Sequence, residues 1–212
     1  MSEEISYTWK GVEGVRIRVT VEPSPNQANA CRFVVDPAVY PEGGAHFSTG
    51  SPTTDSPLAE ALFELEDISK ILIAGNSVSI TTAESKDWGT FSEKVAILIR
   101  DQINSGIPAV ADSFTDALPS PDSIRTQVQE AIDTKINPAV AAHGGVVSLL
   151  DVQGNNIFLE FGGGCQGCGM VSVTLKYGVE KLLRDTIPEI GQILDTTDHA
   201  AGTNPYYAPA SK

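Results

Sequence analysis

Alternating apolar and polar side chains mark the first half of the chain. Residues 15–22 (Val-Arg-Ile-Arg-Val-Thr-Val-Glu) put every second side chain on one face, which predicts a half-buried strand. Similar patterns, and helical spacing after Ser56-Pro57, predict the order strand, strand, helix, strand, strand, helix. The predicted elements lie at residues 15–22, 31–35, 56–65, 68–74, 77–82 and 91–103, with a hairpin turn at Gly75-Asn76 and a Gly-, Pro-, Ser- and Thr-rich loop at 36–57.

The second half shows a different order of patterns. Val128, Ile132, Ile136 and Val140 recur every four residues, which predicts a helix that Pro138 interrupts or kinks. Glycines after His143 suit the end of this helix. The remaining predicted elements are strands at residues 146–152 and 156–161, a helix at 170–186 and a short last strand after Pro188.

These patterns predict an α+β protein with two small α/β domains. Residues 105–122 are rich in proline, serine and glycine, which is typical of a linker that lets two domains move. We therefore expect a first domain at 1–105, a linker at 106–122, a second domain at 123–198 with the order helix-strand-strand-helix-strand, and a tail at 199–212.

Composition and charge narrow the classes of function. The 212 residues include 41% hydrophobic side chains, enough for packed cores, and carry a formal net charge of −13. So acidic a chain repels nucleic acids and anionic lipids, and no basic cluster in the sequence reverses this locally. The start, Met1-Ser2-Glu3-Glu4, lacks the features of a secretory or organelle signal, and no apolar stretch is long enough to cross a bilayer. We expect a soluble, cytoplasmic protein.

The glycine-rich turn at residues 162–169 carries the chemistry. It holds Cys165 and Cys168, two of the three cysteines in the chain, between a predicted strand and a predicted helix. Cys168 precedes the start of that helix, where free N–H groups and the helix dipole favour a thiolate. A C-x-x-C pair of thiolates binds metal or exchanges with disulfides.

Three chemistries fit this pair, and a structural turn is the fourth alternative. The pair supplies half of the four thiolates of an iron–sulfur cluster, so a symmetric dimer would complete the site. A dithiol oxidoreductase would carry its C-x-x-C in a βαβ unit with an aromatic neighbour, whereas the strands here read as a hairpin and glycines flank the pair. A zinc site would need a second C-x-x-C or suitably spaced histidines, and His143 and His199 stand alone.

Several longer motifs carry a resemblance to a known family. In the second half these are Ile136-Asn137-Pro138, His143-Gly144-Gly145, residues 164–170 (GCQGCGM), residues 174–180 (TLKYGVE) and residues 187–190 (IPEI). Residues 128–195 resemble the C-terminal domain of the NifU/Nfu iron–sulfur scaffold and carrier proteins. Residues 25–33, Ser56–Ala59 and the 88–103 helix resemble the Nfu N-terminal domain, and residues 199–207 resemble the tails of bacterial members.

The resemblance implies a carrier without enzymatic activity. Cys165 and Cys168 of two protomers would hold one [4Fe–4S] cluster, received from upstream assembly factors and passed to apo iron–sulfur proteins. The N-terminal domain would help to recognise those clients. Two thiolate pairs also suit [2Fe–2S]. The chain departs from the family at Gly169, where proline often stands, and this departure concerns the lability of the cluster more than the identity of its ligands.

Other chemically active residues have simpler interpretations. Cys31 is interpreted as a half-buried strand residue, because cysteine often behaves as a small hydrophobe. His143 is interpreted as a packing or capping residue, and Lys176 as a solvated residue on a helix face. Glu160 is interpreted as a strand-face charge, and Tyr206-Tyr207 as a tail that packs or stays disordered. No pair of acidic residues predicts general acid–base catalysis.

Overall fold

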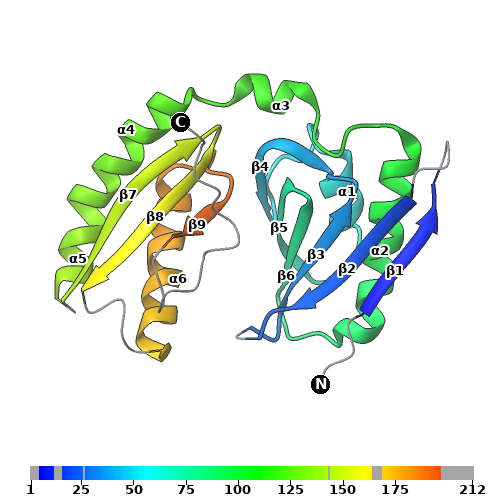
Figure 1. The fold of residues 1–212 in the computed structure, drawn as a ribbon, viewed down its shortest axis with the longest axis horizontal. Helices are drawn as coiled ribbons and strands as arrows, with labels where there is room; N and C mark the ends of the chain where they lie inside the picture. The colour runs from blue at the N-terminus through cyan, green and yellow to red at the C-terminus, as the bar shows by residue number, and fades with distance from the viewer. Residues whose placement is uncertain (1–4, 12–15, 26, 143, 164–168, 197–212) are drawn as a thin grey trace. The chain divides into compact units, whose positions relative to one another are not determined.

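The computed structural model describes residues 5–11, 16–25, 27–142, 144–163 and 169–196 (Figure 1). The chain divides into two compact units, Met1–Leu118 and Pro119–Lys212. Each unit has its own sheet and its own buried core. Helices combined with mainly antiparallel sheets confirm the expected α+β class.

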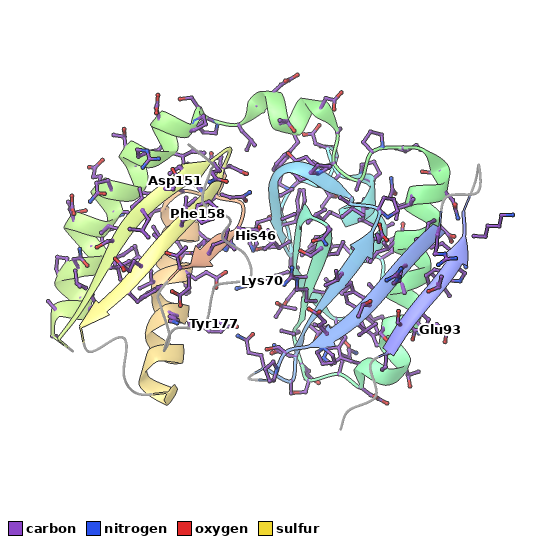
Figure 2. All side chains as sticks on the ribbon, in the orientation of Figure 1. His46, Lys70, Glu93, Asp151, Phe158 and Tyr177 are labelled. Atoms are coloured by element: carbon purple, nitrogen blue, oxygen red, sulfur yellow. The ribbon has the colours of Figure 1, made fainter. Side chains whose placement is uncertain are left out.

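The first unit is built on a six-stranded antiparallel sheet with the order β1-β2-β3-β6-β5-β4. One face buries Phe33, Ile73 and their neighbours beneath the helices, while the other carries polar side chains such as His46 and Lys70 (Figure 2). The elements are β1 (Ile5–Lys10), β2 (Arg16–Pro23), β3 (Ala30–Asp36), β4 (Tyr40–Ser48), α1 (Pro57–Phe63), β5 (Ile68–Gly75), β6 (Ser77–Thr82), α2 (Trp88–Ser105) and α3 (Asp112–Ala117). The four predicted strands and both predicted helices of this half are confirmed as β2, β3, β5, β6, α1 and α2.

The interpretation of residues 36–57 as loop is wrong, because β4 occupies much of this stretch. A bulge between Tyr40 and Gly44 shifts the register and breaks the alternation that would reveal a strand. β4 lies at the edge of the sheet, where Pro41 can be accommodated without loss of a ladder bond. Strand β1, at the other edge, was also not predicted, although its side chains alternate between half-buried and exposed.

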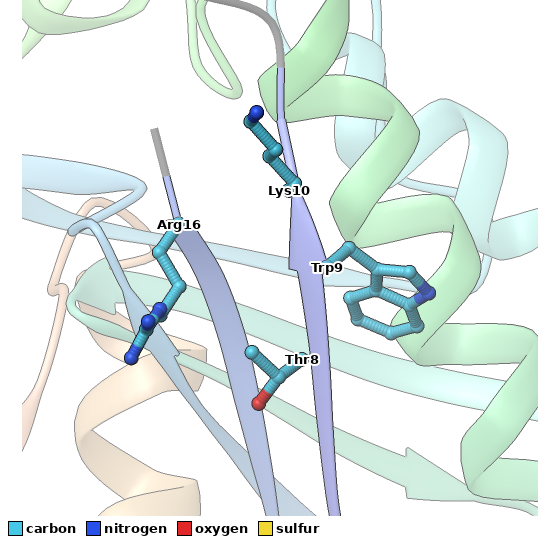
Figure 3. A pocket seen from close by; sticks show the side chains of 4 residues that line it. All are labelled: Thr8, Trp9, Lys10 and Arg16. Carbon is cyan, nitrogen blue, oxygen red and sulfur yellow. The ribbon is translucent and has the colours of Figure 1, made fainter. Parts of the chain in front are cut away.

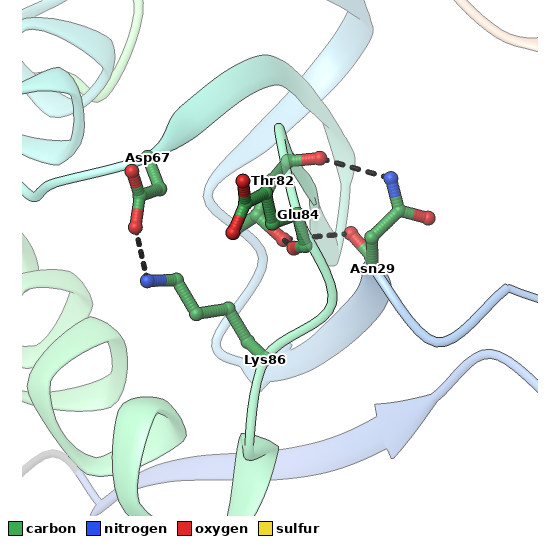
Figure 4. A network of polar contacts seen from close by, with 5 residues as sticks. All are labelled: Asn29, Asp67, Thr82, Glu84 and Lys86. Atoms are coloured by element: carbon green, nitrogen blue, oxygen red, sulfur yellow. Dashed lines mark hydrogen bonds and ion pairs between the residues drawn. The ribbon is translucent and has the colours of Figure 1, made fainter.

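A polar network holds the end of β6 against the start of β3 (Figure 4). The Asn29 amide donates to the Thr82 carbonyl over 2.9 Å, and the Thr82 hydroxyl donates to the Asn29 carbonyl over 3.2 Å. Lys86 forms an ion pair with Asp67 in the same region. Asn29 belongs to the N-terminal motif of the family resemblance, and its contacts give it a structural role.

Ser56 joins two parts of the first unit, as well as beginning helix α1. Its Oγ accepts a hydrogen bond from the Ala59 N–H over 3.2 Å and donates one to the Ala109 carbonyl over 2.8 Å. The side chain is fully buried, so neither partner can turn to water instead. The predicted N-cap is confirmed.

Replacing Ser56 with alanine is expected to lower the free energy of unfolding of the first unit by about 1–2 kcal/mol, because a cap and a buried hydrogen bond are both lost. Urea unfolding measures this change. The exposed Ser85→Ala variant is the control and should unfold like the parent protein. Equal midpoints for the two variants would contradict the role given to Ser56.

Part of the expected linker at 106–122 packs on the first unit. Ala109 and Val110 are buried in its core, and the Tyr40 hydroxyl lies 2.8 Å from that of Thr115 in α3. The division between the two units falls after Leu118. Apolar residues among the prolines therefore attach the first part of this segment to the preceding domain.

The second unit contains a three-stranded sheet with the order β7-β8-β9. Strands β7 and β8 are antiparallel, and β9 runs parallel to β8 after the crossover through α6. The elements are α4 (Pro121–Ala131), the π turn η2 (Ile132–Ile136), α5 (Asn137–Ala141), β7 (Gly145–Gln153), β8 (Asn156–Gly163), α6 (Gly169–Thr186) and β9 (Ile193–Asp195). This confirms the predicted order helix-strand-strand-helix-strand. Among the described residues, no helix is both long enough and apolar enough to cross a membrane.

The π turn η2 explains the four-residue spacing of the buried stripe. In an α-helix, a step of four residues turns the side chain about 40° past a full turn, so the stripe would drift. The wider π turn offsets this drift, and Val128, Ile132, Ile136 and Val140 are all at most 2% exposed. Pro138 lies just after the π turn. The wider backbone of that turn leaves more room for the proline ring than a regular α-helix would.

Asn137 fixes the end of this helix to the sheet. Its Nδ2 donates to the Val147 carbonyl over 3.1 Å, and its Oδ1 accepts from the Val147 N–H over 2.8 Å. The side chain thus pairs with β7 as a residue of a neighbouring strand would. This role accounts for one residue of the Ile136-Asn137-Pro138 motif.

Candidate functional site

The predicted site lies between β8, which ends at Gly163, and α6, which begins at Gly169. Cys165 and Cys168 themselves are outside the described residues. Both flanking elements are described, and β8, α6 and β9 form a strand-helix-strand unit with parallel strands. The cysteine pair is therefore carried at the C-terminal end of a strand and before the start of a helix.

The end of β8 approaches β7 too closely for a side chain at Gly162. A Cβ atom there would lie 2.7 Å from Cγ1 of Val146, the residue opposite it in the register. Any larger residue would have to displace Val146. One glycine of the motif therefore serves the packing of the hairpin that leads into the turn.

Lys176 connects the three elements around the turn. It lies on α6 and forms an ion pair with Asp195 of β9, and its Nζ is 5.3 Å from the centroid of the Phe161 ring in β8. The Lys176 side chain is only 30% exposed. Instead of the solvated residue expected from the sequence, Lys176 is held from two sides.

The anchoring of Asp195 adds to this connection. Asp195 pairs with Leu159 in the parallel ladder, and the next residue, Thr196, donates to the Leu159 carbonyl from its N–H over 2.8 Å and its hydroxyl over 3.0 Å. Phe161, two residues further along β8, is 3% exposed. Both partners of Lys176 are thus held by the sheet.

The far end of α6 is held by Arg184. Its Nη1 donates to the Ile190 carbonyl over 2.9 Å, and its Nε donates to the Glu180 carboxylate over 3.1 Å. Burial lowers the pKa of Arg184 from its usual value, and the Glu180 charge opposes that change. These contacts fix α6 near Pro188 and leave its other end beside the turn.

Cys31 belongs to the first unit, whereas Cys165 and Cys168 belong to the second. Cys31 lies on β3, is 2% exposed, and belongs to the core of the first unit. Burial raises the pKa of its thiol to about 12, so the thiolate that binds metal is disfavoured. The expected half-buried strand residue is in fact fully buried.

In a variant lacking Cys165 and Cys168, Cys31 is expected to resist iodoacetamide at pH 8 until the first unit is unfolded. Mass spectrometry after timed quenching measures this labelling. Because burial favours the neutral thiol, Cys31 contributes to the free energy of unfolding of the first unit below pH 9. This contribution falls as the pH rises from 9 toward 12. Labelling of the native protein at the rate of the denatured protein would contradict the buried placement.

Of the remaining singled-out residues, those that the structure describes do not assemble a second site. His143, Tyr206 and Tyr207 lie outside the described residues. Glu160 is exposed on β8 opposite Ser148, in agreement with a strand-face charge. In the described part of the chain, no group of three His, Cys, Asp or Glu side chains is close enough to hold a metal ion.

The first unit has an open hollow of about 380 Å³ at the β1–β2 hairpin (Figure 3). Thr8, Trp9, Lys10 and Arg16 line it, with Lys10 directly opposite Arg16 in the register. The Trp9 ring points toward α2, where the Arg100 guanidinium carbon is 5.3 Å from its centroid. These four lining residues include no cysteine, and the hollow belongs to the first unit, whereas Cys165 and Cys168 belong to the second.

Comparison with known families matches each half of the chain separately. Residues 19–106 match the family described as scaffold protein Nfu/NifU N terminal, and residues 128–194 match the NifU-like domain. The second match contains Cys165 and Cys168. The chain therefore contains both domains of the Nfu/NifU family, which confirms the resemblance seen in the motifs.

Individual relatives agree with this assignment. The Fe/S biogenesis protein NfuA of Pseudomonas aeruginosa (strain LESB58) is 54% identical over 85 residues, which cover 40% of this chain and 44% of the relative. A NifU-like protein of Schizosaccharomyces pombe is 27% identical over 192 residues, covering 86% of this chain and 74% of the relative. The mitochondrial NFU1 iron-sulfur cluster scaffold homolog of Drosophila virilis is 29% identical over 187 residues, which cover 86% of this chain and 62% of the relative. The match to NfuA thus spans less than half of that relative.

Proposed function

We propose that this chain is an iron–sulfur cluster carrier that binds a cluster through Cys165 and Cys168 and transfers it to apo-proteins. The observation that carries the proposal is the C-x-x-C pair at the β8–α6 junction, inside the residues that match the NifU-like domain. Relatives named for Fe/S biogenesis and for an iron–sulfur scaffold support it. In this role the protein acts as a carrier and not as an enzyme.

The cluster is proposed to be [4Fe–4S], shared by two copies of the chain. One chain offers two thiolates at this turn, whereas such a cluster takes four. Cys31 is buried in the other unit and is not a candidate for a third ligand. A homodimer with Cys165 and Cys168 from each protomer completes the set, and [2Fe–2S] is the alternative with the same ligands.

The proposed partners follow from the chemistry of transfer. Upstream assembly factors load the cluster, and the cysteines of an apo iron–sulfur protein replace the carrier's thiolates one at a time. The first unit is proposed to contribute to the recognition of these clients. The proposed location is the cytoplasm.

Anaerobic reconstitution with iron and sulfide tests the proposal. Visible and Mössbauer spectra of the dimeric fraction are expected to show about one [4Fe–4S] cluster for two chains. The Cys31→Ala variant is the matched control and should load equally. Mixing the loaded dimer with an apo [4Fe–4S] enzyme should then restore that enzyme's activity. A colourless monomer after reconstitution would overturn the proposal.

A dithiol oxidoreductase is the second candidate, because the cysteine pair follows β8 in a strand-helix-strand unit with parallel strands. The antiparallel hairpin predicted from the sequence is the pairing of β8 with β7. It therefore does not count against this candidate, because β8 also pairs in parallel with β9. Turnover in an insulin-reduction assay by the apo-protein, without cluster binding, would favour this candidate. Tight binding of zinc would favour a zinc site instead.

A further inference from the structure

Positively charged side chains gather on the open face of the six-stranded sheet in the first unit. Residues that lie opposite each other in the register share a face, and the register of the strands places these side chains on the face away from the buried core. Figure 3 shows two of them at the β1–β2 hairpin, on the side away from Trp9. We name this set the basic face; it consists of Lys10, Arg16, Arg18, Arg32 and Lys70.

The charge of the basic face is opposite to that of the whole chain. The chain has a formal net charge of −13 with 14 lysine and arginine residues, and five of these 14 belong to the basic face. Among the described residues of the strands, the acidic side chains on the same face are Glu22 and Asp36. The sequence shows no basic run, because the five residues come from four different strands. Folding therefore gives an acidic protein a positively charged face.

The exposed members of the basic face form no ion pair within the described part of the chain. These members are Lys10, Arg16, Arg18 and Lys70. Each of the six ion pairs between described residues lies elsewhere, and none joins Arg18 to Asp36, which is opposite it in the register. Lys10 lies directly opposite Arg16, and like charges in this arrangement destabilise a sheet. A negatively charged partner would relieve this repulsion.

Protection of an exposed sheet edge explains only a small part of this arrangement. A lysine on an edge strand prevents unwanted pairing with another chain, and Lys10 lies on the edge strand β1. Arg16, Arg18 and Arg32 lie on β2 and β3, which are inner strands of the sheet. These three side chains protect no edge, so a binding role accounts for them better.

We propose that the basic face docks an acidic surface of the apo iron–sulfur protein that receives the cluster. The inference rests on the proposed function for the identity of the partner and on charge complementarity for its chemistry. In this docking, carboxylates of the partner lie beside Arg16 and Arg18. The hollow of about 380 Å³ that Lys10 and Arg16 line gives one of these carboxylates room to enter.

The composition of the face favours a protein over a nucleic acid or a membrane. Half-buried side chains such as Thr20, Val34 and Leu72 lie among the cations, and this mixture of polar and apolar surface is typical of protein interfaces. Glu22 and Asp36 would repel a continuous row of phosphates. A folded partner presents separate carboxylates and can place a cation or a hydroxyl opposite these two residues.

Fluorescence anisotropy with the full chain tests the docking. The probe is a fluorescein-labelled peptide of alternating glutamate and threonine residues, and the same peptide with glutamine in place of glutamate is the uncharged comparison. The apo-protein is expected to bind the acidic peptide at low ionic strength and to release it as salt is added. The Arg16→Gln/Arg18→Gln variant should bind the acidic peptide roughly five- to tenfold more weakly.

The matched control is the Lys94→Gln/Lys181→Gln variant. Both lysines are exposed and lie on helices outside the basic face, so this variant loses the same net charge and should bind like the parent protein. The urea midpoint of Arg16→Gln/Arg18→Gln should equal or exceed that of the parent protein, because repulsion from Lys10 is removed. A lower midpoint together with weaker binding would assign the arginines to the fold and overturn the proposal.

Other results would also overturn the docking. Equal losses of affinity in the two double variants would show that net charge alone decides binding. Equal affinity for the charged and the uncharged peptide would show that the cations have no part in it. Tighter binding of an oligonucleotide or of phosphatidylserine vesicles than of the acidic peptide would give the face to a nucleic acid or a membrane instead.

A transfer assay separates this inference from the proposed function. Peptide binding needs no cluster, so failure of the protein to load one would count against the proposed function alone. In loaded protein, Arg16→Gln/Arg18→Gln should keep the cluster content of the parent and transfer the cluster several-fold more slowly to an apo [4Fe–4S] enzyme. Unchanged transfer beside weakened peptide binding would overturn the assignment of the client as the partner.

Discussion

Replacing Cys165 with alanine is expected to abolish cluster binding in the reconstituted protein. The loss should be complete, because a dimer of the variant offers two thiolates where the proposed cluster takes four. Cys168→Ala should give the same result. Absorbance in the visible range and iron and sulfide content of the dimeric fraction measure the effect.

The fold is expected to survive the loss of either cysteine. The core of the second unit is formed by side chains of the helices and of β7 and β8 outside the turn, such as Ile136, Leu159 and Leu183. Far-ultraviolet circular dichroism should therefore match the parent protein. A cysteine variant that keeps a full complement of cluster would contradict the assignment of the ligands.

Replacing Phe33 with alanine is expected to destabilise the first unit by about 3–5 kcal/mol while the second unit still loads a cluster. Phe33 is completely buried and packs edge-on against Trp88, with ring centroids 6.4 Å apart. Among the residues that the structure describes, the two cores have no member in common, so the lost packing is expected to remain within one unit.

Tryptophan fluorescence can follow this effect in the first unit alone, because both tryptophans of the chain, Trp9 and Trp88, belong to it. The matched variant is Leu183→Ala, which removes a completely buried side chain from the core of the second unit. It should lower cluster loading at elevated temperature and leave the tryptophan transition unchanged. A single transition that both variants shift equally would show that the units do not unfold independently.

Local patterns in the sequence predicted most of the fold, and the exceptions have specific causes. Alternation and helical spacing identify an element when its pattern is unbroken, as in β2 or α2. Strand β4 was hidden because a bulge interrupts its alternation beside Pro41 and two glycines. Similarly, the buried residues Ala109 and Val110 stand among prolines and glycine, where composition favours a linker.

The candidate site can be proposed from the sequence, but the contacts of the elements around it cannot. The spacing of Cys165 and Cys168 between a strand and a helix is a local feature and can be read directly. The partner of Lys176 is nineteen residues away, in a short strand, and no periodicity connects the two. Contacts of this kind depend on how α6 crosses from β8 to β9, which only the folded chain shows.

The side chain of Asn137 has a consequence for how copies of this protein associate. Strand β7 is an edge of the sheet, and its outward N–H and carbonyl at Val147 are both occupied by that amide. The bulge between Leu149 and Asp151 further interrupts the ladder that an incoming strand would need. β7 is thus a poor template for a continuous intermolecular sheet, and the dimer proposed to share one cluster is expected to form without this strand.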